Sequence, residues 1–326
     1  MERLGAVVIG RNEGQRFVRC LESLVGRVEH IVYVDSGSTD GSIEHARSQG
    51  VDVLDLDTSI PFTAARARNA GLERLREIAS DTLFVMFVDG DCEVDPGWLP
   101  AATAFFDETE GYGVVCGRRR ERHPGATVYN YLCDVEWNTP VGEAKACGGD
   151  ALMRIEAIAS VQGFDPTLIA GEEPELCVRL RHAGWKIRRI DREMTHHDAN
   201  VTRFSQWWTR TVRAGHAYAE GAAMHGAPPE RHWVKESRRA ILWGGVLPLV
   251  ALLAAPFTQG ASLLLLVLFP VNVARIALRL RHEGEARPWT VATFMMLAKV
   301  PEALGVFRFY NNRRKGAQTP LIEYKS

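Results

Sequence analysis

The sequence predicts an α/β fold in which a mostly parallel sheet flanked by helices is followed by a carboxyl-terminal α-helical membrane segment. Short apolar runs alternate with amphipathic helical patterns over residues 4–91, which is typical of βαβ units. Residues 240–257 contain neither a charge nor a strongly polar side chain, and a run of this length favours the membrane. These two observations divide the 326 residues into a sheet region and a hydrophobic region.

The amino-terminal elements follow one another in regular order. Four strands are predicted, at residues 5–10, 30–38, 51–57 and 83–89. The helices between them are predicted at residues 15–26, 41–50 and 63–79. Asp35 closes the second strand and Asp89 closes the fourth. Because ligands of doubly wound sheets bind just outside the carboxyl ends of the strands, both acids are expected on one rim of the sheet.

Asp89 and Asp91 follow the fourth strand and are separated by one glycine. Such a carboxylate pair can hold a hard divalent cation, which in turn can bridge the oxygens of a diphosphate. A solvated acidic turn is the alternative interpretation. The chain contains neither GxGxxG after its first strand nor GxxxxGK[ST], so dinucleotide oxidoreductases and P-loop enzymes are poor fits.

The composition excludes some partners. The chain has 39 Lys and Arg against 40 Asp and Glu, so its net charge of -1 gives no attraction to nucleic acid, and no nucleic-acid partner is expected. Its six cysteines lack any metal-ligand spacing, and we expect free thiols in a reducing compartment.

A hydrophobic hairpin is predicted over about residues 238–280. Its second arm is interrupted by Pro270, Asn272 and Arg275, so it is either a kinked span or a re-entrant segment. Basic residues crowd both outer ends of the hairpin and are absent from its turn, which predicts that both ends face the cytoplasm. The alternative is a buried hairpin of a soluble protein. The segment at about residues 288–307 carries charges within its apolar run and is predicted to be an interfacial amphipathic helix.

Several motifs together resemble those of the family 2 glycosyltransferases, which have the GT-A fold. They span roughly residues 4–220 in this order: VVIGRNEG, VDSGSTDGS, ARNAGL, VDGDCEVDPGWL, CGGDALMR and GFDPTLIAGEEPELCVRLRHAGWKI. The resemblance implies transfer of a sugar from a nucleotide-diphosphate donor to an acceptor hydroxyl, usually with inversion. It also implies a divalent metal, Mn²⁺ or Mg²⁺.

The resemblance assigns four donor-binding residues. Asp35 matches an acid near the base of the donor, although Ser36 stands where the family commonly has a second aspartate. Arg68 matches a position near the diphosphate; an exposed helix charge is the alternative. Asp89 matches the acid that addresses the ribose or sugar, and Asp91 the acid that contacts the metal.

The catalytic base implied by the resemblance is Glu173, with Glu172 as the alternative. Both are expected in the loop that enters a helix at Pro174, where the helix dipole would stabilise acids in any case. A carboxylate is needed there to take the proton of the acceptor hydroxyl. The family often has a metal-binding histidine further along, which matches His197, with His196 as the alternative.

Residues on the acceptor side are implied more broadly. Asp150 resembles a residue that lines this side of the cleft. Trp207, Trp208 and Arg210 are interpreted as an aromatic and cationic wall, with interfacial anchoring of the tryptophans as the alternative. The basic run at residues 118–123 is interpreted as a solvated face, and a contact with lipid phosphates is the alternative.

These predictions give residues 1–225 as a GT-A catalytic domain and residues 226–326 as a membrane-associated helical region. The predicted protein is an inverting, metal-dependent glycosyltransferase at the cytoplasmic face of the inner membrane. Its expected partners are a nucleotide-diphosphate sugar, a lipid-linked or polysaccharide acceptor, and membrane lipids. A sugar nucleotidyltransferase and a catalytically inactive nucleotide-sugar-binding protein are the alternatives.

Overall fold

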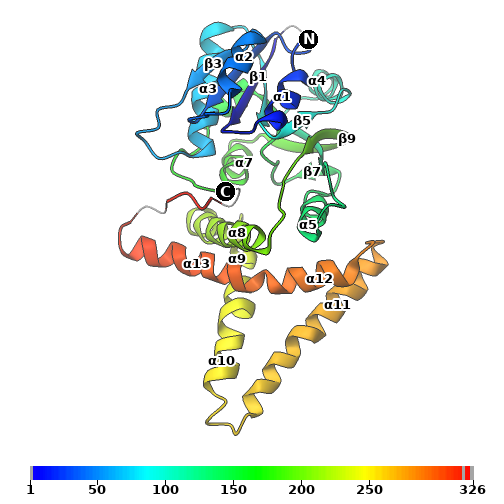
Figure 1. The fold of residues 1–326 in the computed structure, drawn as a ribbon, viewed down its shortest axis with the longest axis vertical. Helices are drawn as coiled ribbons and strands as arrows, with labels where there is room; N and C mark the ends of the chain where they lie inside the picture. The colour runs from blue at the N-terminus through cyan, green and yellow to red at the C-terminus, as the bar shows by residue number, and fades with distance from the viewer. Residues whose placement is uncertain (1–2, 318–319, 324–326) are drawn as a thin grey trace. The chain divides into compact units, whose positions relative to one another are not determined.

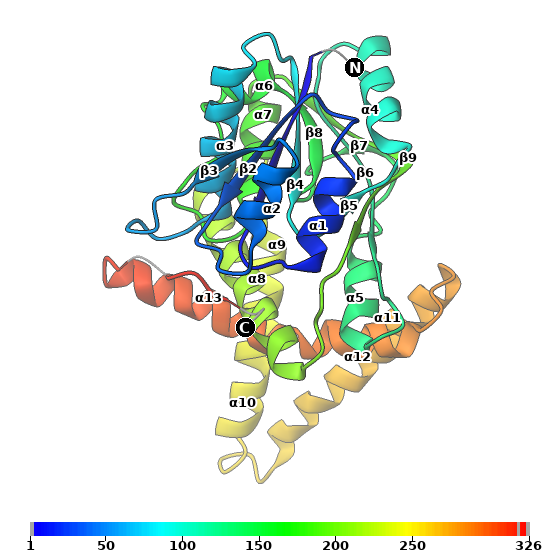
Figure 2. The same cartoon turned by 45° about the horizontal axis from the view of Figure 1, so that its top comes forward.

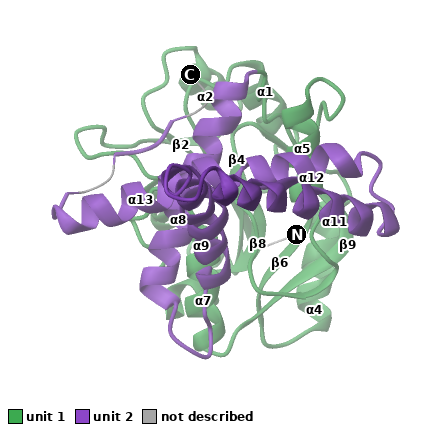
Figure 3. Ribbon diagram, turned by 90° about the horizontal axis from the view of Figure 1, so that it is seen from below, with its two compact units in different colours: residues 1–202 green, residues 203–326 purple. Residues whose placement is uncertain are grey.

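The structure is a computed structural model that describes residues 3–317 and 320–323. The chain forms two compact units, residues 1–202 and 203–326 (Figure 3). The predicted boundary at residue 225 falls at the end of the helix α8 (Phe204–His225), whereas the compact units separate just before this helix. The division between catalytic and membrane regions stays a prediction.

The first unit contains one mixed sheet. Among the described residues its strand order is β3-β2-β1-β4-β8-β6-β9-β5, and β7 pairs with β9. The strands are β1 (Leu4–Gly10), β2 (His30–Asp35), β3 (Asp52–Asp55), β4 (Phe84–Asp89), β5 (Cys92–Val94), β6 (Tyr112–Glu121), β7 (Gly142–Ala144), β8 (Ala151–Arg154) and β9 (Lys186–His197). The first four strands are parallel, as predicted, but β8 pairs antiparallel with β4 and β6. The sheet is therefore parallel in its amino-terminal half and mixed in the other.

Helices cover both faces of this sheet. They are α1 (Gln15–Glu22), α2 (Ser42–Ser48), α3 (Ala64–Ile78), α4 (Trp98–Glu108), α5 (Val128–Glu136), α6 (Ile155–Ser160) and α7 (Glu172–His182). Figure 2 shows α3, α6 and α7 on one side of the strands and α1 and α4 on the other. Gly71 lets α3 approach closely, because a Cβ at this position would lie 2.4 Å from Val7 and 2.8 Å from Val34. This glycine explains part of the ARNAGL motif.

The strand register shows where Asp35 and Asp89 lie at the carboxyl ends of the parallel strands. β1 lies between β2 and β4, with Gly10 paired to Asp35 and Ile9 paired to Asp89. Since neighbouring strands lie roughly 4.8 Å apart, the backbones of the two acids are about two strand spacings apart at the same edge. The prediction that they share this edge is confirmed.

The second unit is helical. It contains α8, α9 (Val234–Ala240), a π-helical segment (Ile241–Val246), α10 (Leu247–Leu253), a 3₁₀ segment (Ala261–Val267), α11 (Leu268–His282), α12 (Pro288–Leu297) and α13 (Lys299–Arg314). Figure 1 shows α10 and α11 as a hairpin whose turn projects away from α8, α12 and α13. Pro270 lies in the first turn of α11, where the 3₁₀ segment gives way to the α-helix.

The structure gives the extent of the helices in the hydrophobic segments. In the part of the chain that it describes, two helices are long and apolar enough to cross a membrane, Ala261–His282 and Pro288–Arg314. The run at residues 240–257 is not one of them, because its helix begins among charges at Val234 and ends at Leu253. The predicted interfacial helix at 288–307 lies within the second of the two.

Candidate active site

Asp89 lies between two arginines at the carboxyl edge of the sheet. Arg68 Nη2 is 2.8 Å from Asp89 Oδ1, and Arg119 Nη2 is 3.3 Å from Asp89 Oδ2. Burial alone would raise the pKa of Asp89, but the two guanidinium groups outweigh it and hold this pKa below its usual value. Asp89 is therefore an anion with neighbours that also attract phosphate.

Arg68 also holds both candidate bases. Its Nη1 is 2.8 Å from Glu172 Oε1 and 2.8 Å from Glu173 Oε1. Burial, followed by the negative charges of Glu172 and Asp89, raises the pKa of Glu173 to about 7, although Arg68 opposes the shift. A carboxylate with a pKa near neutrality is suited to accept a proton at physiological pH. Arg68 itself is only 2 % exposed, so the interpretation as a solvated helix charge is wrong.

The start of α7 presents the two glutamates. The helix begins at Glu172 after Gly171, which adopts φ 82°, so both acids are helical residues rather than members of the preceding loop as predicted. Pro174 occupies the first turn, where its missing N–H costs nothing. Asn69 fastens the preceding loop to α3, because its side chain donates to Phe164 O and accepts from Phe164 N. The helix that carries Arg68 thus also positions α7.

Gly149 marks the point where these groups converge. A Cβ at this position would lie 2.7 Å from Asp89 Oδ2, 2.9 Å from Arg68 Nη2 and 3.1 Å from Glu173 Oε1. Any side chain here would displace the three groups or be displaced by them. The second glycine of the CGGD motif therefore leaves space beside the first acid and the candidate base.

Asp91 and His197 form a pair that can hold a cation. Asp91 Oδ2 is 3.1 Å from His197 Nε2, and both side chains are buried. Two ligands about 2.1 Å from one cation at right angles stand about 3 Å apart, so the pair fits a shared ion. Its mixed oxygen and imidazole donors fit Mn²⁺ better than Mg²⁺. Cys92 completes a group with ligand atoms within 4.8 Å of one another, but burial raises the pKa of its thiol well above the ordinary value.

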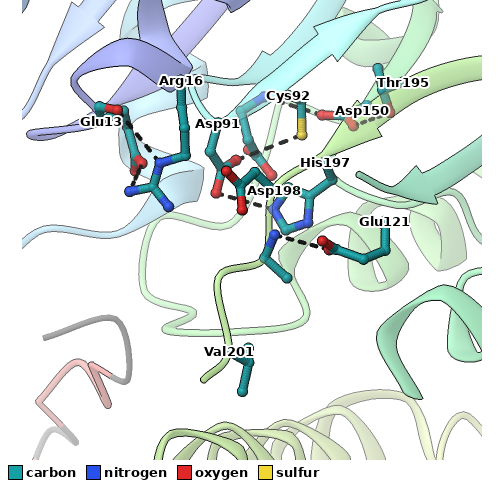
Figure 4. A network of polar contacts seen from close by, with 12 residues as sticks. Glu13, Arg16, Asp91, Cys92, Glu121, Asp150, Thr195, His197, Asp198 and Val201 are labelled. Atoms are coloured by element: carbon teal, nitrogen blue, oxygen red, sulfur yellow. Dashed lines mark hydrogen bonds and ion pairs between the residues drawn. The ribbon is translucent and has the colours of Figure 1, made fainter. Parts of the chain in front are cut away.

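The strand β9 separates the two histidines. Neighbouring side chains of a strand point to opposite faces, so only one of the pair can face Asp91, and it is His197. Figure 4 shows Glu121 beside this strand end, where its carboxylate accepts from Ala199 N at 3.0 Å. This contact fixes the chain two residues beyond His197.

The side chain of Asp35 accepts hydrogen bonds from residues next to it in the chain. Its Oδ2 accepts from Gly37 N and Ser38 N at 2.8 Å each, and its Oδ1 accepts from Tyr33 Oη at 2.7 Å. Ser36 donates to Gly10 O. The structure thus gives Asp35 a role in shaping the turn at the end of β2, and a direct contact with a base stays a prediction.

Asp150 is fully buried beneath the turn of Asp89. Its Oδ1 accepts from Asp89 N at 3.1 Å, and its Oδ2 accepts from Arg119 Nε at 2.9 Å and from Thr195 Oγ1 at 2.7 Å. These are the contacts of a residue that positions Asp89 and Arg119. A direct contact with an acceptor stays a prediction.

The sequence interpretation missed Arg119. Within the run at residues 118–123 it was assigned to a solvated face, but its guanidinium group contacts two acids and lies 5.4 Å from the ring centre of Trp137. Arg120 at 45 % side-chain exposure fits the solvated interpretation. The available signal was that the run continues an apolar strand. Arg118 is buried as well, and the pairing with β9 shifts its register between Arg118 and Arg119.

Trp207, Trp208 and Arg210 lie on α8 in the second unit. Trp207 packs edge-on against Phe294 of α12, with ring centres 5.1 Å apart, and Phe204 lies beside both tryptophans. Trp207 is thus a packing residue within its own unit. The proposed wall on the acceptor side stays a prediction.

Comparison with known proteins identifies the fold that carries this arrangement. Residues 6–143 match the model of a family described as glycosyl transferase family 2. The match covers the first three strands of the sheet and the turn of Asp89 and Asp91. Two pre-mycofactocin glycosyltransferases, from Mycobacterium tuberculosis strains CDC 1551 / Oshkosh and ATCC 25618 / H37Rv, are each 28 % identical over an alignment of 286 residues that covers 82 % of the chain. The chain spans 57 % of the length of these curated relatives.

Solved structures show the same GT-A architecture. A mannosyltransferase from Pyrobaculum calidifontis in complex with GDP-Man and Mn²⁺ has a TM-score of 0.62 and 18 % identity, with 94 % of this chain and 87 % of that chain covered. Glucosyl-3-phosphoglycerate synthase from Mycobacterium tuberculosis, in complex with Mn²⁺, UDP-Glc and glycerol 3-phosphate, has a TM-score of 0.50 and 18 % identity over 70 % of this chain and 81 % of that chain. At these identities the similarity shows the fold alone.

Proposed function

We propose that this protein is an inverting glycosyltransferase that moves a sugar from a nucleotide-diphosphate donor to an acceptor hydroxyl. The observation that carries the proposal is the convergence of Asp89, Arg68 and Glu173 around Gly149. Such a displacement requires a carboxylate that binds the donor, a cation for its phosphates and a base for the acceptor hydroxyl. The printed names of the relatives, all sugar transferases or synthases, support it.

Glu173 is the proposed base. As the acceptor oxygen attacks the anomeric carbon, Glu173 takes its proton, and the bond to the diphosphate breaks on the opposite side of the sugar. The raised pKa of Glu173 matches this role, whereas Glu172, at 4 % exposure, is the more enclosed of the two. Glu172 then acts by its charge on Glu173 and Arg68.

Donor binding is assigned to the rim of the sheet. Asp35 shapes the turn beside the nucleotide base of the donor. Asp89 binds the ribose or the sugar, and Arg68 attracts the diphosphate. Asp91 and His197 would hold a divalent cation, Mn²⁺ or Mg²⁺, which supplies positive charge to the leaving diphosphate. The Mn²⁺ in the two solved structures supports the choice of a divalent cation.

The proposed location is the cytoplasmic face of the inner membrane, with a lipid-linked or polysaccharide acceptor. The exposed apolar hairpin and the basic residues at its outer ends support membrane association. An acceptor held in or near the bilayer would be available to an enzyme anchored in this way. Trp207, Trp208, Arg210 and Asp150 are the residues assigned to the acceptor side.

Donor screening in detergent tests the function. Purified protein is incubated with UDP-, GDP- and dTDP-sugars, with Mn²⁺ or with a chelator, and the released nucleotide is identified. Metal-dependent release of one nucleoside diphosphate is expected, and it should be lost in Asp91→Asn. Release of pyrophosphate from a nucleoside triphosphate and a sugar phosphate would instead show a nucleotidyltransferase. Binding without turnover of any donor would show an inactive binding protein.

A further inference from the structure

We propose that the hairpin of α10 and α11 is re-entrant: it enters one leaflet of an anionic bilayer and returns to the same face without crossing. In this arrangement α12 and α13 lie along the headgroups. The proposal concerns the second unit alone and does not depend on the transferase reaction. Four observations carry it.

The first observation is the length of the two arms. Residues 240–253 and residues 261–274 are each 14 uncharged residues, bounded on the outer side by Arg239 and Arg275. With about 1.5 Å per α-helical residue and about 2.0 Å per 3₁₀ residue, these uncharged parts reach roughly 21 to 25 Å. A hydrocarbon core of about 30 Å needs roughly 20 residues. The whole helix Ala261–His282 is long enough to cross, but crossing would draw Arg275 into the hydrocarbon, where a charge is costly.

The second observation is the turn itself. Thr258 Oγ1 donates to Ala254 O at 2.9 Å and accepts from Ser262 N at 3.1 Å, while Ser262 Oγ donates to Ala251 O at 2.7 Å. The backbone N–H groups of residues 254, 255, 257, 258, 260, 261 and 263 all donate to carbonyls within the hairpin. A turn in water has no need of such internal pairing. A turn in hydrocarbon does, because an unsatisfied polar group costs several kcal/mol there.

The third observation is the exposure of the hairpin. The turn itself carries the exposed polar side chains of Thr258 and Gln259, but the side chains on both sides of it are large and apolar, with Phe257 at 88 % exposure and Leu253 and Leu264 at about 70 %. No charge occurs between residues 241 and 274. Such a surface is far larger than the scattered apolar residues of a soluble protein, and lipid chains match its chemistry.

The fourth observation concerns α12 and α13, which carry an exposed apolar stripe. Their exposed stripe includes Trp289, Leu297, Leu304 and Phe307. The opposite face packs on α8 so tightly that a Cβ at Gly305 would lie 2.1 Å from Val212 O. Because α8 carries Arg210, Arg213 and Glu220, it belongs on the water side. A helix fastened to it along one face cannot be a lipid-surrounded span, and its other face can rest on the membrane.

Charge identifies the kind of bilayer. Residues 203–326 carry 17 Lys and Arg against 7 Asp and Glu, whereas residues 1–202 carry 22 against 33. The second unit thus has a net charge of +10, and the first unit −11. The basic residues include runs at the outer ends of the hairpin and at the end of α13, next to the surfaces assigned to the headgroups. Negatively charged headgroups are the partner that this distribution attracts.

A fluorescence experiment tests the path of the hairpin. The six native cysteines are buried, so Phe257→Cys can be labelled with an environment-sensitive thiol fluorophore and reconstituted by insertion into phosphatidylglycerol-containing vesicles. We expect strong quenching by lipids brominated near the ends of their acyl chains, and little quenching by iodide outside or inside the vesicles. Quenching by iodide trapped inside would show a spanning hairpin, and quenching by external iodide would show that the turn stays in water. Either result would overturn the proposal.

Glu283→Cys is the matched control, because this residue lies at the exposed corner after α11. External iodide should quench a label there, whichever path the hairpin takes. The choice of lipid is tested with unlabelled protein and sedimented vesicles. Vesicles of phosphatidylglycerol should bind more protein than vesicles of phosphatidylcholine, and the difference should shrink as salt is added. Equal binding at low salt would refute the anionic part of the proposal.

Discussion

Glu173 should make the activity of the transferase fall on the acidic side of neutral pH, which is the acidic limb of its pH–rate profile. The pKa of Glu173 is raised to about 7 by burial and by the charges of Glu172 and Asp89. Only the ionised form can accept a proton, so activity is lost as the pH falls through this pKa. With a pKa of about 7, roughly 90 % of the base is ionised at pH 8 and roughly 10 % at pH 6. We therefore expect kcat/KM to fall about tenfold between these values, measured as nucleoside diphosphate released from the donor found by screening.

Two substitutions decide which glutamate is the base. Glu173→Gln should lower kcat by about 10² to 10⁴, or about 3 to 5 kcal/mol of transition-state stabilisation, and should remove the acidic limb. Glu172→Gln should keep substantial activity and move the limb to lower pH, because the charge of Glu172 helps to raise the pKa of Glu173. This reasoning would be refuted if Glu172→Gln lost all activity while Glu173→Gln kept the acidic limb of its pH–rate profile at the same pH. The base would then be Glu172.

Three further substitutions probe the rest of the site. His197→Ala should weaken Mn²⁺ binding measured by electron paramagnetic resonance, whereas His196→Ala, which alters the opposite face of the strand, should not; equal effects would contradict the assigned ligand. Arg119→Lys should lower kcat/KM about 10- to 100-fold, because a charged hydrogen bond to an acid is lost. The larger change should be in the KM for the donor, and an unchanged KM would contradict a positioning role. Gly149→Ala should cost about 100-fold in kcat because its Cβ displaces three groups, whereas Gly148→Ala, with nothing within 4 Å, should be neutral; similar rates for both would contradict the convergence.

The parallel half of the sheet could be predicted from the sequence because the patterns that specify its strands and helices lie within short stretches of the chain. Apolar runs of strand length, separated by helical patterns, fix the order of the first four strands, and the rule for carboxyl ends then places Asp35 and Asp89 on one edge. The mixed half could not be predicted in the same way. Its short strands β5, β7 and β8 are stabilised by pairing with strands distant in sequence, and no local period specifies the partner.

The sequence by itself determined the candidate acids and the hydrophobic hairpin through residue type and spacing, and the candidate base pair through the resemblance to the family 2 glycosyltransferases. Only the tertiary structure decided their neighbours. It showed that Arg68 and Arg119 are buried between acids rather than solvated, and that the carboxylate of Asp91 faces His197. The physical reason is that charge partners and desolvation are set by side chains from distant elements, whereas a sequence pattern records only what is near along the chain.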